Sequence, residues 1–307
     1  MRVLEEAGCK VTVPQNPGLP EPVELKEAVK DADAILSILT ERVGPELMDA
    51  APRLRVISNM AVGFDNIDVK EASKRGIAVC NTPGVLTETT ADFAFALMMA
   101  VARRMIEAHQ MVERGEFEWW GPQLLMGADI HGGTLGIIGF GKIGQAMARR
   151  AQGFSMKVLY SGRTAPESSP LGEKVSQQSL LENSDFVSLH VPYRDSTHHL
   201  LGKPEFQLMK SSAFLINTAR GPVVNETELV DALQHREFAG AALDVFEEEP
   251  SVHPGLLKLS NVVLAPHVAS ASVATRSLMA RMAAENLLAC LKGEEPHSIV
   301  NPEVLRA

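Results

Sequence analysis

The sequence predicts an α/β protein built from two doubly wound parallel-sheet domains. The chain has 307 residues, which exceeds the usual size of a single domain. Short apolar runs typical of buried strands alternate with helical patterns along the chain, as right-handed βαβ units require. One of these strands leads directly into a glycine-rich turn and then a helix, the pattern of a dinucleotide-binding unit.

The first part of the chain is expected to open with a helix over Arg2–Ala7 that ends at Gly8. The elements after it follow the same periodicity rules. Strands are expected at Lys10–Val13, Ala34–Leu39, Leu54–Ser58 and Ile77–Cys80, helices at Glu24–Asp31 and Gly44–Ala51, and one long helix at Thr87–Gly115. The turn signal Asn81–Gly84 closes the last of these strands and predicts a hinge.

A second series of strands begins after the long helix. Strands are expected at Leu135–Ile138, Lys157–Tyr160, Phe186–Leu189, Phe214–Ile216, Gly240–Leu243 and Val262–Leu264. A final helix over Ala274–Lys292 is expected to return the chain to the first domain. We therefore expect one domain of residues 1–82 and 271–307 and a second of residues 83–270.

Composition excludes several classes of protein. The chain carries 29 Lys and Arg against 38 Asp and Glu, a net charge of −9. A net negative charge does not attract nucleic acid or an anionic membrane. The longest apolar stretch, Phe93–Ala102, is too short to span a bilayer, and the N-terminus does not resemble a signal peptide. The cysteines are odd in number and far apart, which argues against a disulfide framework and favours the cytoplasm. No histidine spacing predicts a metal site.

The glycine-rich turn predicts a dinucleotide-binding loop made of Gly139, Phe140, Gly141, Lys142, Ile143 and Gly144. Gly139 allows a tight turn, and Gly141 lets backbone N–H groups approach a pyrophosphate. Gly144 allows close packing of the helix on the sheet, and the N-terminus of that helix favours negative charge.

The end of the next strand predicts the choice of cofactor. An NAD site usually has an acidic residue there, but this strand runs into Ser161, Gly162, Arg163 and Thr164, with no carboxylate before Glu167. Arg163 can bind a 2′-phosphate through a charge-assisted hydrogen bond. We therefore expect NADP in preference to NAD; the alternative is that Arg163 is a solvated loop residue that stacks on adenine.

Three later segments carry the candidate catalytic residues. Asn217–Gly221 contains Arg220, Asp244–Pro250 contains several acids, and Ala265–Ser270 contains His267. Each segment follows a predicted strand, and ligands of open parallel sheets bind at the carboxyl ends of the strands. An Arg that holds a carboxylate, a His that donates a proton and an acid that orients the His together suit carbonyl reduction.

With Ala61–Asp65, Asn81–Gly84 and Thr87–Asp92, these motifs make nearly the whole chain resemble the D-isomer-specific 2-hydroxyacid dehydrogenases, most closely the glyoxylate/hydroxypyruvate reductase branch. The resemblance implies a Rossmann cofactor domain inserted in a flavodoxin-like substrate domain, and a cytoplasmic homodimer formed through the Rossmann domain. It further implies reduction of small 2-keto acids such as glyoxylate or hydroxypyruvate, with 2-ketogluconate as a further candidate. One departure is Gly133, where the family commonly has Lys.

The resemblance also assigns roles to single residues. Arg220 binds the substrate carboxylate and keto oxygen, His267 is the acid/base, and Glu249, the acid directly before Pro250, is its partner. Glu247 and Glu248 are then expected in solvent. The remaining residues implied by the resemblance are Val62, Gly63 and Trp120 for substrate, Trp120 in a neighbouring subunit's site, and Thr90, Thr218, Ala219 and Asp244 for cofactor. Simple interface packing is the alternative for Trp119 and Trp120.

Two other functions stay open at this point. One is a protein of the co-repressor type, which resembles the same family and uses the dinucleotide fold to sense nucleotide and dimerise. The other is an NAD-dependent D-2-hydroxyacid dehydrogenase. The family's first domain also begins with a strand before its first helix, whereas Met1 lies inside that helix. We therefore expect the natural start about 15–20 residues upstream, enough for one strand and a turn.

Overall fold

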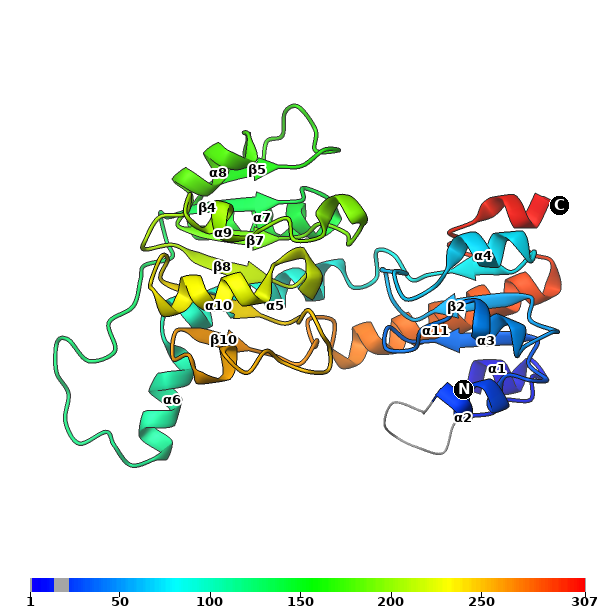
Figure 1. Ribbon diagram of the computed structural model, residues 1–307. Helices are drawn as coiled ribbons and strands as arrows, with labels where there is room; N and C mark the ends of the chain where they lie inside the picture. Colours follow the sequence, from blue (N-terminus) through cyan, green and yellow to red (C-terminus); the bar gives the residue numbers. More distant parts are fainter. Residues whose placement is uncertain (1, 14–21, 307) are drawn as a thin grey trace. The chain divides into compact units, whose positions relative to one another are not determined.

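The computed structural model describes residues 2–13 and 22–306 and divides the chain into two compact units. The smaller unit comprises Met1–Leu86 and Ser272–Ala307, and the larger unit is the uninterrupted stretch Thr87–Ala271. Each unit contains a parallel sheet flanked by helices (Figure 1). This architecture confirms the α/β fold class predicted from the alternation of strands and helices.

The smaller unit is built on a three-stranded parallel sheet in the order β1-β2-β3. Its strands are β1 (Ala34–Ser37), β2 (Val56–Asn59) and β3 (Ala78–Cys80), and its helices are α1 (Arg2–Glu6), α2 (Pro22–Ala28), α3 (Pro45–Asp49), α4 (Val69–Lys74), α11 (Val273–Lys292) and the 3₁₀ helix η4 (Pro302–Arg306). Helix α11 packs against the sheet, where Ala284 and Leu287 are buried with α1 and β3 residues. Ser272 caps its first turn and Gly293, in the left-handed region, ends it.

The sequence predicts a strand at Lys10–Val13, and this prediction is wrong. The segment is irregular, and it pairs with no strand in the described ranges 2–13 and 22–306. Lys10, Thr12 and Val13 are exposed. Alternating β-branched residues favour a strand only where a neighbouring strand takes up their backbone hydrogen bonds, because strand propensity mainly reflects packing between neighbours.

The larger unit is built on a seven-stranded parallel sheet in the order β10-β9-β8-β7-β4-β5-β6. Its strands are β4 (Thr134–Ile138), β5 (Lys157–Ser161), β6 (Glu173–Lys174), β7 (Phe186–Leu189), β8 (Phe214–Asn217), β9 (Gly240–Leu243) and β10 (Val262–Leu264). The first strand of the larger unit, β4, lies between β5 and β7, so the order of strands reverses there. Ligands of such sheets bind at this switch point, beyond the carboxyl ends of the strands.

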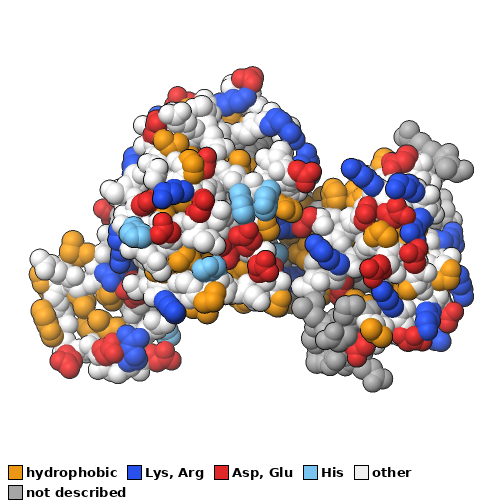
Figure 2. Space-filling view, viewed as in Figure 1, with side chains coloured by type: hydrophobic (Ala, Val, Ile, Leu, Met, Phe, Trp, Pro, Cys, Tyr) orange, Lys and Arg blue, Asp and Glu red, His pale blue; other side chains and the backbone are white. Residues whose placement is uncertain are grey.

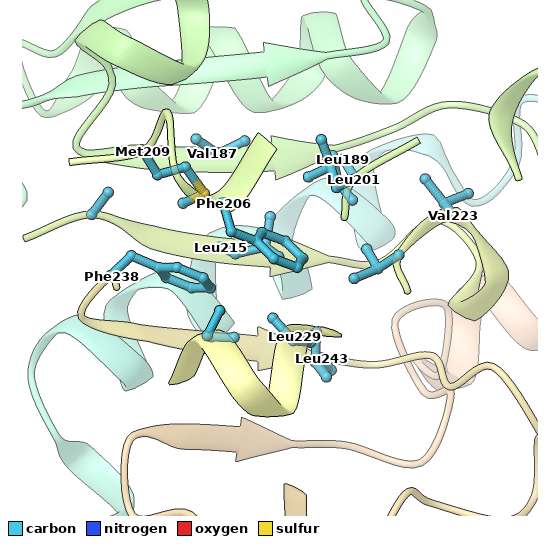
Figure 3. Close-up of a cluster of buried hydrophobic side chains, with 14 of the residues drawn as sticks. Val187, Leu189, Leu201, Phe206, Met209, Leu215, Val223, Leu229, Phe238 and Leu243 are labelled. Carbon is cyan, nitrogen blue, oxygen red and sulfur yellow. The ribbon is translucent and has the colours of Figure 1, made fainter. Parts of the chain in front are cut away.

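Helices cover both faces of the larger sheet. The helices of the larger unit are α5 (Thr87–Ala102), α6 (Met105–Glu113), α7 (Lys142–Gly153), α8 (Gln177–Asn183), α9 (Lys203–Phe206), α10 (Glu226–Gln234) and the 3₁₀ helices η1 (Asp195–Thr197), η2 (Gly221–Val223) and η3 (Leu256–Lys258), and α6 is the one that does not lie on the sheet. Successive strand residues face opposite ways, so Leu215 belongs to one core cluster and Ile216 to the other. Figure 3 shows the cluster that contains Leu215, in which Phe206 lies beside Leu215 and Leu229 beside Leu243.

The long helix expected at Thr87–Gly115 is interrupted. Arg104 has φ +51°, which ends α5 and starts α6 in a new direction. The backbone N–H of Ala128 bonds the carbonyl of Ala102 at 2.9 Å, and a Cβ at Gly127 would lie 2.3 Å from that oxygen. A returning loop therefore takes the acceptor that a continuous helix would use, and α6 projects from the unit (Figure 1).

Candidate active site

The glycine loop at the end of β4 is shaped by two close backbone approaches. Gly139 has φ +99°, and a Cβ there would lie 2.6 Å from the carbonyl carbon of His190, which follows β7. A Cβ at Gly144 would lie 2.3 Å from the carbonyl oxygen of Gly139. Gly141 caps α7 without a side-chain hydrogen bond, so the first N–H groups of that helix have no side-chain acceptor there. The loop therefore suits an anion such as a pyrophosphate.

The other loop residues support this backbone conformation. Phe140 is buried and stacks on Tyr160, with ring centroids 3.8 Å apart, so its side chain belongs to the core and only its backbone faces the loop. Gln145 Nε2 donates to the Phe140 carbonyl at 3.1 Å. Lys142 is exposed and Ile143 half-buried at the start of α7.

The end of β5 presents small and cationic residues. Ser161 is buried, Gly162 has φ +156°, and Arg163 and Thr164 are exposed. Glu167 is not at this strand end, since its Oε1 pairs with Lys174 Nζ at 2.5 Å. The strand end of the larger unit thus places an exposed guanidinium where NAD-binding sites have a carboxylate.

Three buried residues of the larger unit are candidates for contact with a nicotinamide. The Thr218 hydroxyl is buried and has no hydrogen-bond partner among the described residues, which a ligand amide could supply. Ala219 and Thr90 are also buried, Thr90 in the first turn of α5. Together with the glycine loop, this unpartnered hydroxyl fits a dinucleotide cofactor.

Arg220 is held by a side chain that the sequence analysis had not singled out. Asn217 Nδ2 donates to the Arg220 carbonyl and Asn217 Oδ1 accepts from the Ala219 N–H, both at 3.0 Å. A Cβ at Gly221 would lie 1.9 Å from the Phe246 carbonyl carbon and oxygen. The segment that carries Arg220 therefore packs tightly against the segment that carries Glu249. Arg220 is half-buried, and its positive charge contributes to lowering the pKa of Glu249.

His267 and Glu249 form a direct pair. His267 Nδ1 lies 2.8 Å from Glu249 Oε2, and Glu249 Oε1 accepts the Phe246 N–H at 2.9 Å. Burial raises the pKa of Glu249, but the hydrogen bond and charge of His267 outweigh it, so this pKa lies below its ordinary value. His267 Nε2 is the ring atom that does not contact Glu249, and it can exchange a proton with a substrate.

Asp244 supports the loop that carries His267. Its carboxylate accepts the N–H groups of Val268 and Ala269, both at 2.8 Å, and its carbonyl accepts the His267 N–H at 2.8 Å. These three bonds hold His267 at φ +54°, a left-handed conformation that costs free energy for a non-glycine residue. The Asp244 side chain is fully buried, and its contact with the cofactor stays a prediction.

Glu247 was expected in solvent, and the structure corrects this. Glu247 Oε1 lies 2.5 Å from His199 Nε2, and its Oε2 accepts the Glu226 N–H at 3.1 Å. Glu226 Oε1 in turn accepts the Glu247 N–H. These reciprocal bonds anchor the loop just before Glu249, whereas Glu248 is exposed as expected.

In the smaller unit, asparagine side chains shape the loop after β2. Asn81 Nδ2 donates to the Val62 carbonyl and Asn59 Nδ2 to the Gly63 carbonyl, both at 2.8 Å. The N–H groups of Val62 and Gly63 bond no other described residue. This loop thus presents two free backbone donors, the arrangement expected of a carboxylate-binding loop.

Trp120 lies in the irregular segment after α6 and is 75% exposed, so it touches little of its own chain.

Within the described chain, no three His, Cys, Asp or Glu side chains could hold a metal ion. In the same residues, no helix is long and apolar enough to cross a membrane.

Sequence analysis missed three supports of the site: Asn217, the Glu226–Glu247 pair and the backbone at His190 beside the glycine loop. Burial of its imidazole lowers the pKa of His190 to about 4, and its Nε2 lies 2.9 Å from Ser188 Oγ. Its position directly after β7, the strand beside β4 at the switch point, was the available signal.

Comparison with known proteins decides the family. Residues 95–269 match the family model of the D-isomer specific 2-hydroxyacid dehydrogenase NAD binding domain. The chain belongs to the D-isomer-specific 2-hydroxyacid dehydrogenases. It is 55% identical over 286 residues to a glyoxylate reductase of Korarchaeum cryptofilum, covering 91% of this chain and 86% of the relative.

Solved structures share the fold of this chain. The TT0316 protein from Thermus thermophilus is 44% identical, with a TM-score of 0.91 and coverage of 97% of this chain and 94% of that one. An NADPH-dependent glyoxylate/hydroxypyruvate reductase from Sinorhizobium meliloti, solved with NADP and malonate, is 37% identical, with a TM-score of 0.83 and coverage of 89% and 85%. The protein is therefore a 2-hydroxyacid dehydrogenase or reductase that uses a nicotinamide cofactor, as the resemblance in its motifs predicts.

Proposed function

We propose that this dehydrogenase is an NADPH-preferring reductase that converts small 2-keto acids to D-2-hydroxy acids. Glyoxylate and hydroxypyruvate are the proposed substrates, with 2-ketogluconate as a further candidate. The observation that carries the proposal is the His267–Glu249 pair beside the Arg220 segment at the carboxyl edge of the larger sheet. The glyoxylate reductase name of the Korarchaeum relative supports the substrate class.

The chain's own residues have distinct tasks in this reaction. His267 donates a proton from Nε2 to the carbonyl oxygen, while Glu249 holds the ring in place through Nδ1. Arg220 binds the substrate carboxylate and the keto oxygen, and the Val62 and Gly63 N–H groups are further carboxylate donors. The chemistry that a bound NADPH supplies is a hydride for the carbonyl carbon.

The other proposed contacts concern the cofactor. The glycine loop from Gly139 to Gly144 would hold the pyrophosphate at the start of α7. On the nicotinamide side we propose contacts from Thr90, Thr218, Ala219 and Asp244, of which the Thr218 hydroxyl has no hydrogen-bond partner among the described residues.

The proposal is tested by turnover of glyoxylate or hydroxypyruvate with NADPH, measured as the loss of NADPH absorbance. Binding of NADPH without turnover would favour a nucleotide sensor instead.

Arg163 should set the cofactor preference. Arg163→Ala removes the exposed guanidinium at the end of β5, and we expect it to weaken NADPH binding by about 1–3 kcal/mol, the value of a hydrogen bond to a charged group. NADH, which lacks the 2′-phosphate, should bind almost as before. KM and binding measurements with both cofactors check this, and Arg163→Lys, which keeps a positive charge, should lose less. Equal weakening of both cofactors would contradict the assignment.

Glu249 should set the pH range of reduction. Although burial raises it, the hydrogen bond and charge of His267 lower the pKa of Glu249, so the carboxylate should persist below the ordinary titration range of a glutamate and be lost only when Glu249 itself is protonated. Glu249→Gln has no carboxylate to protonate, so it should reduce more slowly than the wild type near neutral pH and lack the acid-side fall in rate that protonation of Glu249 causes in the wild type. Rate–pH profiles check the direction. Glu248→Gln, which changes an exposed acid in the same loop, should leave the profile unchanged.

We propose in addition that the protein is a homodimer formed through the larger unit. Helix α6 has no buried residue, and it and the loop after it expose large apolar side chains. These are Met105, Ile106, Val112, Phe117, Trp119, Trp120, Leu124 and Met126. Figure 2 shows hydrophobic side chains gathered over this projecting arm. A monomer rarely exposes so large an apolar patch, and a second copy would cover it and bring Trp120 to its partner.

The double variant Ile106→Glu and Val112→Glu should be monomeric in light scattering, because two charges would enter the apolar interface. Both side chains are exposed in the single chain, so the variant should still fold. Val273→Glu, an exposed position in the smaller unit, is the matched control and should remain dimeric. A dimeric double variant would show that this arm is not the interface.

A further inference from the structure

All three cysteines of the chain lie in one hydrophobic cluster of the smaller unit. Cys80 at the end of β3 and Cys290 near the end of α11 are buried in it, and half-buried Cys9 packs against it. The three residues are far apart in the sequence, which is why the sequence predicted no disulfide. The fold therefore creates a thiol cluster that the cysteine spacing does not reveal.

Cys80 and Cys290 are in direct contact. Their Sγ atoms are 3.6 Å apart, although 210 positions separate the two residues. A disulfide requires about 2.05 Å, so the sulfur atoms need to approach by about 1.5 Å, which side-chain rotation with a small backbone shift can supply. The hydrogen bond from the Cys80 thiol lowers the pKa of the Cys290 thiol, although burial opposes this.

We propose that Cys80 and Cys290 are a redox modification site that closes to an intramolecular disulfide on reaction with a hydroperoxide. Cys290 reacts first, because its residue is 9% exposed whereas Cys80 is fully buried. Among the residues that the structure describes, no third His, Cys, Asp or Glu joins this pair to form a group that could hold a metal ion. Cys80 is the resolving thiol, since its sulfur already contacts that of Cys290.

The chemistry balances in two steps. The Cys290 sulfur attacks a peroxide oxygen, the O–O bond breaks, and Cys290 becomes a sulfenic acid while hydrogen peroxide is reduced to water. The Cys80 thiol then attacks the sulfenic sulfur, the S–O bond breaks, and a second water leaves with the Cys80 proton. The two thiols have lost two electrons to one peroxide molecule, and a dithiol reductant can restore them by exchange.

The disulfide would join the two parts of the smaller unit covalently. Strand β3 belongs to its first part and α11 to its second, and the whole larger unit lies between them in the sequence. A crosslink over so long a loop restricts the unfolded chain, so the oxidised form should be the more stable one. This inference does not depend on the proposed substrate or cofactor.

The test treats the folded protein with hydrogen peroxide, removes it, denatures the chain and alkylates the free thiols. We expect one alkyl group per oxidised chain, on Cys9, against three for the reduced protein. Intact mass before alkylation should fall by two hydrogens, and the oxidised chain should migrate faster on a non-reducing gel until dithiothreitol is added. Cys9→Ser should behave like the wild type, whereas Cys80→Ser and Cys290→Ser should not form the fast band.

Peptide mapping and melting complete the test. A crosslinked peptide pair containing Cys80 and Cys290, with a higher melting temperature for the oxidised wild type, is the expected result. Peroxide should not raise the melting temperature of Cys290→Ser. Three free thiols after oxidation, a disulfide that includes Cys9, or a crosslink between two chains would each overturn the proposal.

Discussion

Replacing His267 by alanine should lower the rate of keto-acid reduction by a factor of about 10²–10⁴, because the variant has no group to donate the proton. Cofactor binding should be nearly unchanged, since the glycine loop and the end of β5 are separate segments of the chain. Steady-state kinetics and a cofactor titration measure the two effects separately.

Two further variants distinguish the loss of the imidazole from a disturbance of the backbone. His267 has φ +54°, and Asn accepts the left-handed region more readily than most residues, so His267→Asn removes the ring at little cost in backbone strain. It should lose as much rate as His267→Ala. His235→Ala removes an exposed histidine at the end of α10 and should keep full activity. Substantial reduction by both His267 variants would show that another group donates the proton.

Gly221→Ala should be the most damaging small substitution in the larger unit. Its Cβ would lie 1.9 Å from two atoms of the Phe246 backbone, which cannot rotate away as a side chain could. Overpacking of this kind costs roughly 1–3 kcal/mol or more, and we expect the upper end of that range. The segments that carry Arg220 and Glu249 would be forced apart, and a displacement near 1 Å can reduce a rate by about 100-fold.

Thermal melting and kinetics on the same variant check both effects. Gly153→Ala is the matched control, because a Cβ there meets no heavy atom within 4 Å and the residue ends α7. Alanine favours helix over glycine, so this control should melt at the same temperature as the wild type or slightly above it. A Gly221→Ala enzyme with normal melting and normal rate would show that the Arg220 segment adapts without cost.

Features set by local pattern were predictable from the sequence. The glycine loop, the strands of the larger sheet and the placement of Arg220, Glu249 and His267 at strand ends all depend on short-range periodicity and on one rule of parallel sheets. The reciprocal hydrogen bonds of Glu226 and Glu247 were not predictable in this way, because they join residues 21 positions apart and the acidic residues of a loop do not reveal their partners.

Features that depend on contacts between segments far apart in the sequence were not predictable. Thr87–Gly115 has a helical pattern throughout, yet Ala128 takes the carbonyl of Ala102 and the helix breaks. Lys10–Val13 has a strand pattern without a neighbouring strand. The Cys80–Cys290 contact depends on how α11 crosses the small sheet, and no local pattern records that geometry.

The order of segments in the two units has a consequence for folding during synthesis. Strands β1 to β3 leave the ribosome before the larger unit, but α11, which buries Ala284 and Leu287 with β2 and β3, is made after it. At about 5–20 residues per second, this sheet waits on the order of 10–40 s for its covering helix. The larger unit can fold as soon as it emerges. Until α11 is made, the residues of β2 and β3 that it buries stay uncovered, and exposed apolar surface of this kind favours aggregation of a nascent chain.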